Sequence, residues 1–253
     1  MSDELLLRYS RQILMPDIGT EGQERLAAAH AVVMGLGGLG SPVSAYLAAA
    51  GIGHLTLVDF DRVDLSNLQR QILHGQHDIG RLKVESAADS LRRLNPGCRL
   101  STVARRLDLA ELGALCAEAD VILDGTDNFA SRALINHAAV NAGVPLVSGA
   151  VIRFEGQVAT FDFRDPSSAC YHCLYGDGEE LGETCGESGV LASLPGVIGS
   201  LQATEALKLL LGLPTLAGKL LLVDGLAMSF RTLSLSRDPA CRVCGPAAPA
   251  AGT

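Results

Sequence analysis

The sequence contains no tryptophan, and aromatic residues make up only 4% of its 253 residues. Its first residues, Met1-Ser2-Asp3-Glu4, have neither the basic lead nor the apolar core of a secretory signal peptide. Excess positive charge is also absent, because 28 acidic residues outweigh 20 lysines and arginines and give a net charge of −8. These absences argue against secretion and against nucleic acid or a membrane surface as the main partner. They predict a soluble, cytoplasmic protein.

Charge is missing altogether from residues 31–53, a stretch long enough to suggest a membrane span. Glycines, serines and a proline near its start divide this stretch into a strand, a turn and a helix instead. Hydrophobic residues make up 48% of the chain, which at this length is enough for one large domain with an ample core.

A glycine-rich turn follows the short apolar run at residues 31–34. Gly35, Gly37 and Gly40 fit the pattern G-x-G-x-x-G, in which glycines let backbone N–H groups approach phosphate at a helix N-terminus. The next apolar run ends in Asp59, where an acidic residue would meet ribose hydroxyls. A tight turn that binds nothing is the alternative, but the acid at this position favours a nucleotide. The turn alone does not identify which nucleotide.

Apolar runs alternate with helical segments through the first 150 residues, which predicts a parallel sheet with helices on both faces. Ser41 is expected to cap the helix after the turn, and Thr20 with Gln23 fits a capping box for an earlier helix. From residue 151 the pattern changes to alternating, antiparallel strands. The expected strands lie at residues 31–34, 54–58, 99–107, 120–124, 145–148, within 151–163, at 220–223 and at 230–235.

The predicted fold class is therefore α/β: a Rossmann-like, doubly wound, mostly parallel sheet extended by C-terminal antiparallel strands and a zinc-binding element. We expect a single domain at residues 1–245, with a nucleotide-binding half at 1–150 and a partner-binding and zinc-binding half at 151–245. The tail at 246–253 is rich in alanine and proline and is expected to be disordered.

Charged side chains follow the predicted strands, at the carboxyl edge where doubly wound sheets bind ligands. Arg11, Arg70 and Lys83 lie on segments that can face one cleft, and phosphates require such donors. Asp127 follows the strand at 120–124 and can hold Mg²⁺ through its oxygens. Any one of these charged residues alone would be typical of a solvated surface. The prediction of a phosphate and metal site therefore depends on their occurring together. An NAD-dependent oxidoreductase would need the turn and its acid but not the cations or the metal carboxylate.

Two cysteine pairs with C-x-x-C spacing lie far apart, Cys170 with Cys173 and Cys241 with Cys244. Such pairs in a cytosolic protein point to a metal rather than to disulfides. Four thiolates supply a closed tetrahedral Zn²⁺ site with no position left open for catalysis. We therefore expect a structural zinc that ties the C-terminal segment to the loop after residue 163.

Three further cysteines complete the seven in the chain. Cys98 and Cys116 are expected to pack as small apolar side chains. Cys185 is a lone thiol in a polar loop, where an incidental cysteine is the ordinary interpretation.

Taken together, the motifs resemble those of the HesA/MoeB/ThiF family, the bacterial relatives of the ubiquitin-activating enzymes. The resemblance runs from about Leu6 to Gly245. The residues that carry it are Arg8-Tyr9-Ser10-Arg11-Gln12-Ile13, the glycine turn at 35–40, Asp59-Phe60-Asp61, Ser66-Asn67-Leu68-Gln69-Arg70-Gln71, Lys83, Thr126-Asp127-Asn128, the two cysteine pairs and the segment at 196–202.

The resemblance implies an enzyme that uses ATP and Mg²⁺ to adenylate the C-terminal glycine of a small ubiquitin-like sulfur carrier, with release of pyrophosphate. It implies that Asp59 holds the ribose, that Asp127 binds Mg²⁺ and that Arg11 reaches the phosphates from the other subunit of a homodimer. Gly38, Asn67, Arg70 and Lys83 would hold the phosphates. The full nucleotide-binding set it implies is Gly35, Gly37, Gly38, Gly40, Asp59, Asp61, Ser66, Asn67, Gln69, Arg70, Lys83, Asp127 and Asn128.

The implied catalytic residues are Arg11, Arg70, Lys83 and Asp127, with Cys185 added in one branch of the family. That branch serves thiamine synthesis, and its cysteine bonds covalently to the activated carrier. The other branch serves molybdopterin synthase, and the segments at 147–157 and 238–245 are more similar to it. The implied partners are a carrier ending in Gly-Gly, bound to the homodimer as a heterotetramer, and a separate sulfur donor. A non-catalytic scaffold that binds the carrier is a third hypothesis.

Overall fold

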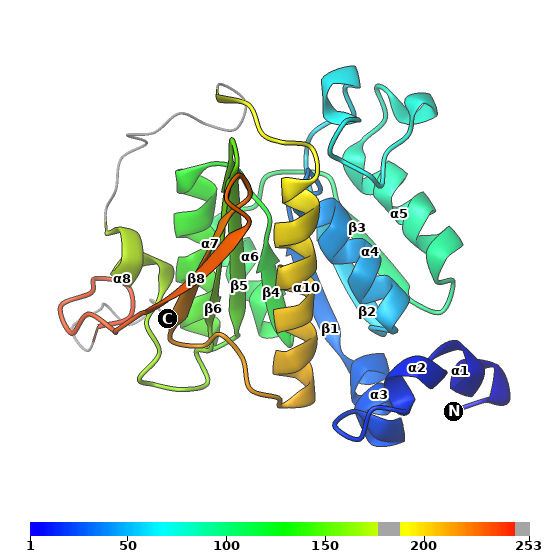
Figure 1. Ribbon diagram of the computed structural model, residues 1–253, viewed down its shortest axis with the longest axis horizontal. Coiled ribbons are helices and arrows are strands. Elements are labelled where there is room, and N and C mark those ends of the chain that lie inside the picture. Colours follow the sequence, from blue (N-terminus) through cyan, green and yellow to red (C-terminus); the bar gives the residue numbers. More distant parts are fainter. Residues whose placement is uncertain (177–187, 246–253) are drawn as a thin grey trace.

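The computed structural model describes residues 1–176 and 188–245, in which helices cover both faces of a twisted sheet (Figure 1). The strands are β1 (His30–Met34), β2 (His54–Val58), β3 (Arg99–Val103), β4 (Val121–Asp124), β5 (Leu146–Ile152), β6 (Glu155–Phe161), β7 (Lys219–Asp224) and β8 (Ser229–Ser234). The helices are α1 (Asp3–Arg8), α2 (Ser10–Ile13), α3 (Gly19–Ala28), α4 (Gly40–Ala50), α5 (Lys83–Leu94), α6 (Leu109–Ala117), α7 (Phe129–Ala142), α8 (Tyr171–Tyr175) and α10 (Leu194–Leu211), with short 3₁₀ turns η1 (Leu65–Asn67) and η2 (Gln76–Asp78).

The sheet has the order β3-β2-β1-β4-β5-β6-β7-β8 within the described residues. Strands β1 to β5 are parallel, and β1 pairs with β2 on one side and β4 on the other. The order in which strands are added therefore switches from one side of β1 to the other. Such sheets bind ligands in the crevice at this switch point, beyond the carboxyl ends of β1 and β4. The predicted doubly wound topology is confirmed.

The last strands extend the sheet in antiparallel fashion, as the change of pattern after residue 150 predicts. β5 pairs with β6, β6 with β7, and β7 with β8, each antiparallel. Strand β8 is exposed along its whole length, while β6 is buried over its last four residues. The mixed sheet of the prediction is therefore confirmed.

Two apolar layers hold the sheet between the helices. One lies under α4, α5 and α10 and includes Leu47, Leu91 and Ile198, all buried. The other lies under α6, α7 and α8 and includes Cys116 and Ile135. No helix in residues 1–176 or 188–245 is both long enough and apolar enough to span a bilayer.

Several expected element boundaries are wrong. The first helix breaks at Tyr9, because the tyrosine ring turns inward and its hydroxyl accepts a hydrogen bond from Asn95 Nδ2 at 2.9 Å. Helix α3 begins at Gly19 without a side-chain cap, so Thr20 and Gln23 form no capping box; the Gln23 amide donates to the Ala50 carbonyl at 2.9 Å instead. Likewise, α4 begins at Gly40, and Ser41 lies inside it.

Candidate functional site

Two of the glycines in the turn after β1 are required by the backbone itself. Gly35 has φ of +83°, a conformation that disfavours side chains. At Gly40, an added Cβ would lie 1.8 Å from the carbonyl oxygen of Gly35, so α4 could not begin this close to the strand. Gly37 and Gly38, in contrast, line a cavity beside the turn.

Asp59 lies immediately after β2 and anchors the turn. Its Oδ2 accepts the Leu36 backbone N–H at 2.7 Å, and its Oδ1 accepts the Asp61 backbone N–H at 2.8 Å. Burial raises the pKa of this carboxyl, while Lys83 and the two backbone donors oppose that rise. The carboxylate is therefore fixed in place at the carboxyl edge of the sheet.

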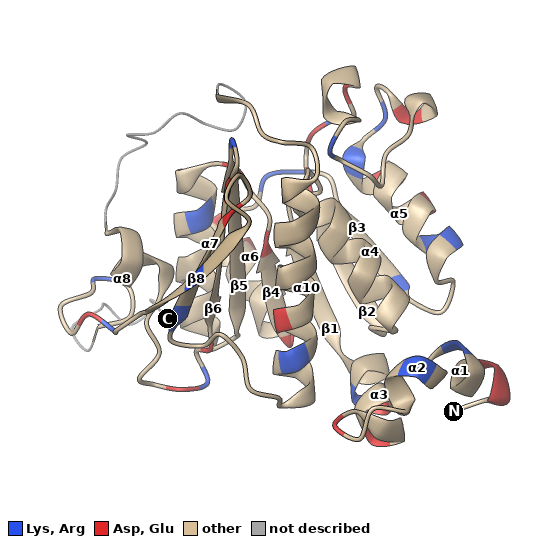
Figure 2. Ribbon diagram, in the orientation of Figure 1, with Lys and Arg blue, Asp and Glu red and all other residues tan. Residues whose placement is uncertain are grey.

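Lys83 and Arg70 bring two cations to the same cavity. Lys83 is the first residue of α5, is buried, and places its Nζ 3.0 Å from Asp61 Oδ2. Arg70 follows η1, and its Nη1 donates to the Ser66 carbonyl at 3.0 Å. The segment that runs from the end of β2 to the start of α5 and includes both cations holds residues of both signs (Figure 2).

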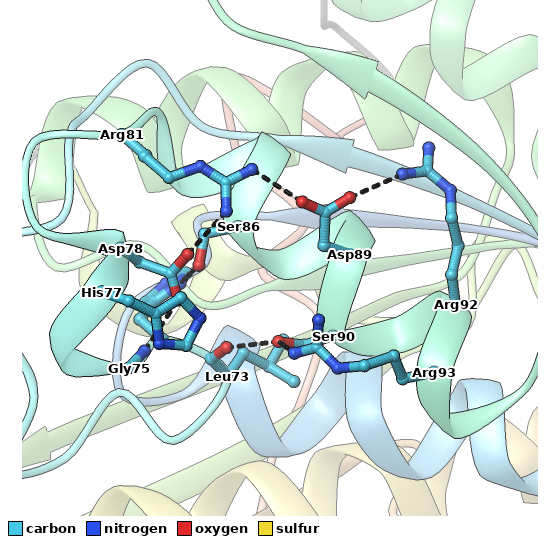
Figure 3. A network of polar contacts seen from close by, with 11 residues as sticks. Leu73, Gly75, His77, Asp78, Arg81, Ser86, Asp89, Ser90, Arg92 and Arg93 are labelled. Carbon is cyan, nitrogen blue, oxygen red and sulfur yellow. Dashed lines mark hydrogen bonds and ion pairs between the residues drawn. The ribbon is translucent and has the colours of Figure 1, made fainter.

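A network of ion pairs and hydrogen bonds fixes this segment against α5. Figure 3 shows Arg81 between two carboxylates, 2.7 Å from Asp78 Oδ1 and 2.6 Å from Asp89 Oδ2. Ser90 Oγ also donates to the Leu73 carbonyl at 2.7 Å. Because α5 begins with Lys83, the same network fixes that cation relative to the turn.

The loop after β4 supplies a carboxylate on the other side of the turn. Asp124 is buried and accepts from the backbone N–H and the hydroxyl of Thr126 at 3.0 and 2.7 Å. Asp127, two residues beyond Gly125, is exposed to the cavity. Asn128 caps α7, since its Oδ1 accepts the Ser131 N–H at 2.9 Å.

These groups surround one cavity of about 350 Å³. Nine residues of the predicted nucleotide-binding set line it: Gly35, Gly37, Gly38, Asp59, Asp61, Arg70, Lys83, Asp127 and Asn128. A second cavity, of about 360 Å³, shares Asp127, Arg132 and Val151 with the first and continues along β5, β6 and β7.

Other predicted site residues do not line the cavity. Gly40 serves the packing of α4, and Ser66 and Asn67 belong to η1, where Asn67 Oδ1 accepts the Asp64 backbone N–H at 3.2 Å. Gln69 is exposed outside it. Arg11 lies on α2, which Figure 1 shows at the opposite end of the sheet from the cavity. One chain alone therefore does not bring Arg11 to the site.

Four polar residues that the sequence reasoning missed also line the cavity: Gln71, Arg105, Arg106 and Arg132. Strand β3 ends at Val103 rather than at residue 107, so the two neighbouring arginines lie at the carboxyl edge of the sheet. The guanidinium of Arg106 lies 4.1 Å from the centre of the Phe60 ring. The adjacent arginines Arg105 and Arg106 could have been predicted as site residues if the strand had been expected to end before them.

The two C-x-x-C pairs meet beyond the sheet, although 67 residues lie between Cys173 and Cys241 in the sequence. The four sulfurs lie within 4.8 Å of one another, with Cys173 and Cys244 3.4 Å apart and Cys170 and Cys241 3.7 Å apart. Tetrahedral thiolates at the Zn–S distance of about 2.3 Å would stand about 3.8 Å apart. The donor set and its spacing therefore fit zinc.

The remaining cysteines divide between core and loop. Cys98 and Cys116 are buried, and burial raises the pKa of each thiol to about 11. Both thiols therefore stay protonated and pack as small apolar side chains, as predicted. Cys185 lies outside the described residues, so its predicted role stays a prediction.

A glycine turn, a fixed carboxylate and two cations at the carboxyl edge of a doubly wound sheet define a nucleotide-binding α/β protein. The sequence pattern of the ThiF family matches residues 9–243. Since the match covers almost the whole chain, the protein belongs to the ThiF family.

Two curated relatives match over nearly their whole length. The molybdopterin-synthase adenylyltransferase of Escherichia coli is 50% identical over 97% of this chain and 98% of the relative. The sulfur carrier protein ThiS adenylyltransferase of the same organism is 45% identical, with 97% of each chain covered. The crystal structure of E. coli MccB with ATP has a TM-score of 0.81 at 25% identity and covers 94% of this chain and 74% of that one.

Proposed function

We propose that this protein activates a small sulfur-carrier protein by adenylating its C-terminal glycine with ATP. The observation that carries the proposal is the 50% identity, end to end, with a molybdopterin-synthase adenylyltransferase. The carrier carboxylate attacks the α-phosphorus of ATP, an acyl-adenylate forms, and pyrophosphate leaves. Both reactants are anionic, so positioning and charge neutralisation supply most of the catalysis.

The cavity offers a group for each part of the nucleotide. Asp59 would accept ribose hydroxyls, and the backbone at Gly37 and Gly38 would approach the phosphates. Arg70 and Lys83 would neutralise them, with Asn67 assisting from η1. Asp127 would hold Mg²⁺, which would offset further phosphate charge when bound. These roles rest on the shared cavity, on the chemistry of each group and on the family resemblance.

The second cavity gives the carrier a route to the nucleotide. Because it shares Asp127 and Arg132 with the first, an extended tail lying along β5 to β7 would deliver its terminal carboxylate beside the phosphates. Ala150 on its wall carries only a methyl group and leaves room for backbone, which suits a tail ending in Gly-Gly.

Arg11 would act on the phosphates of a second copy of the chain. Helix α2, which carries Arg11, lies at the opposite end of the sheet from the carboxyl ends of the parallel strands (Figure 1), and this supports an assembly in which two copies complete each other's sites. The complete unit would be a homodimer with one carrier on each chain. Zinc at the four cysteines would fix the segment at 238–245 beside α8 and leave no coordination position open.

Between the two family branches, we favour the molybdopterin-synthase carrier as the substrate. The identity with the molybdopterin-branch relative, 50%, exceeds the 45% with the thiamine-branch relative at equal coverage of this chain. The thiamine-pathway carrier is the alternative, and there Cys185 would have a covalent role.

ATP–pyrophosphate exchange with purified carriers of both types tests the proposal. We expect exchange that depends on the carrier and is faster with the molybdopterin-type carrier. Tight binding of NAD together with no carrier-dependent exchange would favour the oxidoreductase hypothesis instead. Complex formation without pyrophosphate release would favour the scaffold.

A further inference from the structure

Gln71 is a buried amide that the fold does not use. Its side chain is only 4% exposed, and its Oε1 has no hydrogen-bond partner among the described residues. The residue lines the nucleotide cavity, and its Nε2 lies 3.5 Å from the point where a side chain on Gly37 would begin. A buried acceptor without a partner destabilises the folded protein. Such a group requires an explanation.

Gln202 shows what a structural explanation looks like. It too is fully buried with an unpartnered Oε1, but its Nε2 donates to the carbonyls of Asp124 and Val147 at 2.8 and 3.2 Å. That amide holds α10 against β4 and β5, and it lines neither cavity. In Gln71, by contrast, only the backbone forms hydrogen bonds within the described part of the chain.

The backbone on both sides of Gln71 is fixed, so the amide is held beside the turn. Its N–H donates to the Asn67 carbonyl at 3.0 Å, and its own carbonyl accepts the His74 N–H at 3.1 Å. The His74 ring bridges Ser86 Oγ and the Leu36 carbonyl at 2.8 and 3.1 Å. His74 thereby connects the Gln71 segment to the turn itself.

We propose that Gln71 is a nucleotide-binding residue whose amide hydrogen-bonds the phosphates of ATP, an inference that rests on the proposed function. The Nε2 group is a neutral donor beside Gly37, in the cavity that Arg70 and Lys83 also line. This donor gives the phosphates a directed hydrogen bond without adding charge to the cavity. The amide is thus fixed in position for a ligand, and its lack of a partner lowers the stability of the unliganded protein.

Gln71→Met tests the assignment, since methionine has a similar length and no hydrogen-bonding amide. We expect ATP to bind about 12- to 150-fold more weakly, the loss typical of one hydrogen bond to a charged group, while adenosine binds as before. The melting temperature of the unliganded protein should stay the same or rise. Direct calorimetric titration of ATP and adenosine measures the affinities without any carrier.

Gln202→Met is the matched control. It should lower the melting temperature, because two strand carbonyls lose a donor, and leave the ratio of ATP to adenosine affinity unchanged. An unchanged ratio in Gln71→Met would overturn the assignment, whatever its melting temperature. Because binding is measured apart from turnover, a wild-type protein that binds ATP but catalyses no carrier-dependent exchange would refute the proposed function and leave this test intact.

Discussion

The glycines of the turn after β1 have different physical duties. Gly35 and Gly40 are fixed by backbone geometry, whereas an added Cβ at Gly37 or Gly38 would meet only side chains at the wall of the cavity. The sequence pattern counts Gly35, Gly37 and Gly40 alike. The pattern could therefore predict a turn that binds phosphate, but it could not separate residues that shape the turn from residues that meet the ligand.

Gly40→Ala should destabilise the protein by about 3 kcal/mol, the upper range of overpacking, because the new Cβ would lie 1.8 Å from the Gly35 oxygen. Gly113→Ala is the control. No atom lies within 4 Å of the added Cβ in the middle of α6, so this variant should gain about 0.5–1 kcal/mol. Denaturant unfolding measures both. Equal effects in the two variants would contradict this division of duties.

Asp127→Ala should reduce pyrophosphate exchange by about 100-fold or more, as expected when an electrostatic group in an active site is lost. The side chain is exposed, so the melting temperature should stay close to that of the wild type. Exchange rates measured over a range of Mg²⁺ concentrations test the metal role. Normal exchange in this variant would remove Asp127 from the site.

At the scale of elements, the order of strands and helices could be predicted, because the spacing of apolar residues and the composition of each segment indicate it directly. The errors fall where tertiary contacts override local pattern. Tyr9 breaks a helix because its ring packs inward beside Gly51 and its hydroxyl accepts a hydrogen bond from Asn95 Nδ2. β3 stops short of Arg105 and Arg106, which the pattern assigned to the strand.

The amino ends of β1 and β2 carry a stacked histidine pair, His30 and His54, with ring centres 3.9 Å apart. Burial, His30 and Arg99 lower the pKa of His54 from 6.5 to about 4. The unfolded chain therefore binds a proton at higher pH than the folded protein does. The contribution of His54 to stability is complete above pH 6.5 and is lost as the pH falls toward about 4.

His54→Gln should therefore flatten the decline of melting temperature between about pH 6.5 and about 4. The variant and the wild type differ most in slope within that window and run parallel above it. Thermal unfolding across the pH range makes the comparison. Identical slopes in both proteins would show that His54 does not titrate between the two states.

At the scale of the whole molecule, the cysteine pairs tie the chain's last described segment to α8. Cys241→Ser should abolish zinc binding, reduce metal content from about one zinc per chain, and cost about 3 kcal/mol, or about 6–12 °C in melting temperature. Cys98→Ala, a core substitution, should keep its zinc. Elemental analysis decides, and wild-type protein purified without zinc would refute the site.

The proposed assembly of two copies is the feature that one chain could least reveal. Arg11 was predicted as a phosphate-binding cation from its charge, and its action across two subunits was predicted from the resemblance; its place on α2, away from the cavity, is consistent with that second prediction. Mixing equal amounts of Arg11→Ala and Asp127→Ala protein should restore activity to about a quarter of the wild type. About half of all dimers would then contain one subunit of each variant, and each such dimer carries one intact site out of two. No recovery after subunit exchange would mean that Arg11 does not act across an interface.

Transfer of AMP to the end of a sulfur carrier can be observed directly by intact-mass spectrometry of a molybdopterin-type carrier incubated with the protein, ATP and Mg²⁺. We expect the carrier to gain the mass of one AMP group, and a carrier that lacks its final glycine to gain none. If the protein binds the nucleotide and neither the molybdopterin-type nor the thiamine-type carrier changes in mass, the protein is not a sulfur-carrier adenylyltransferase.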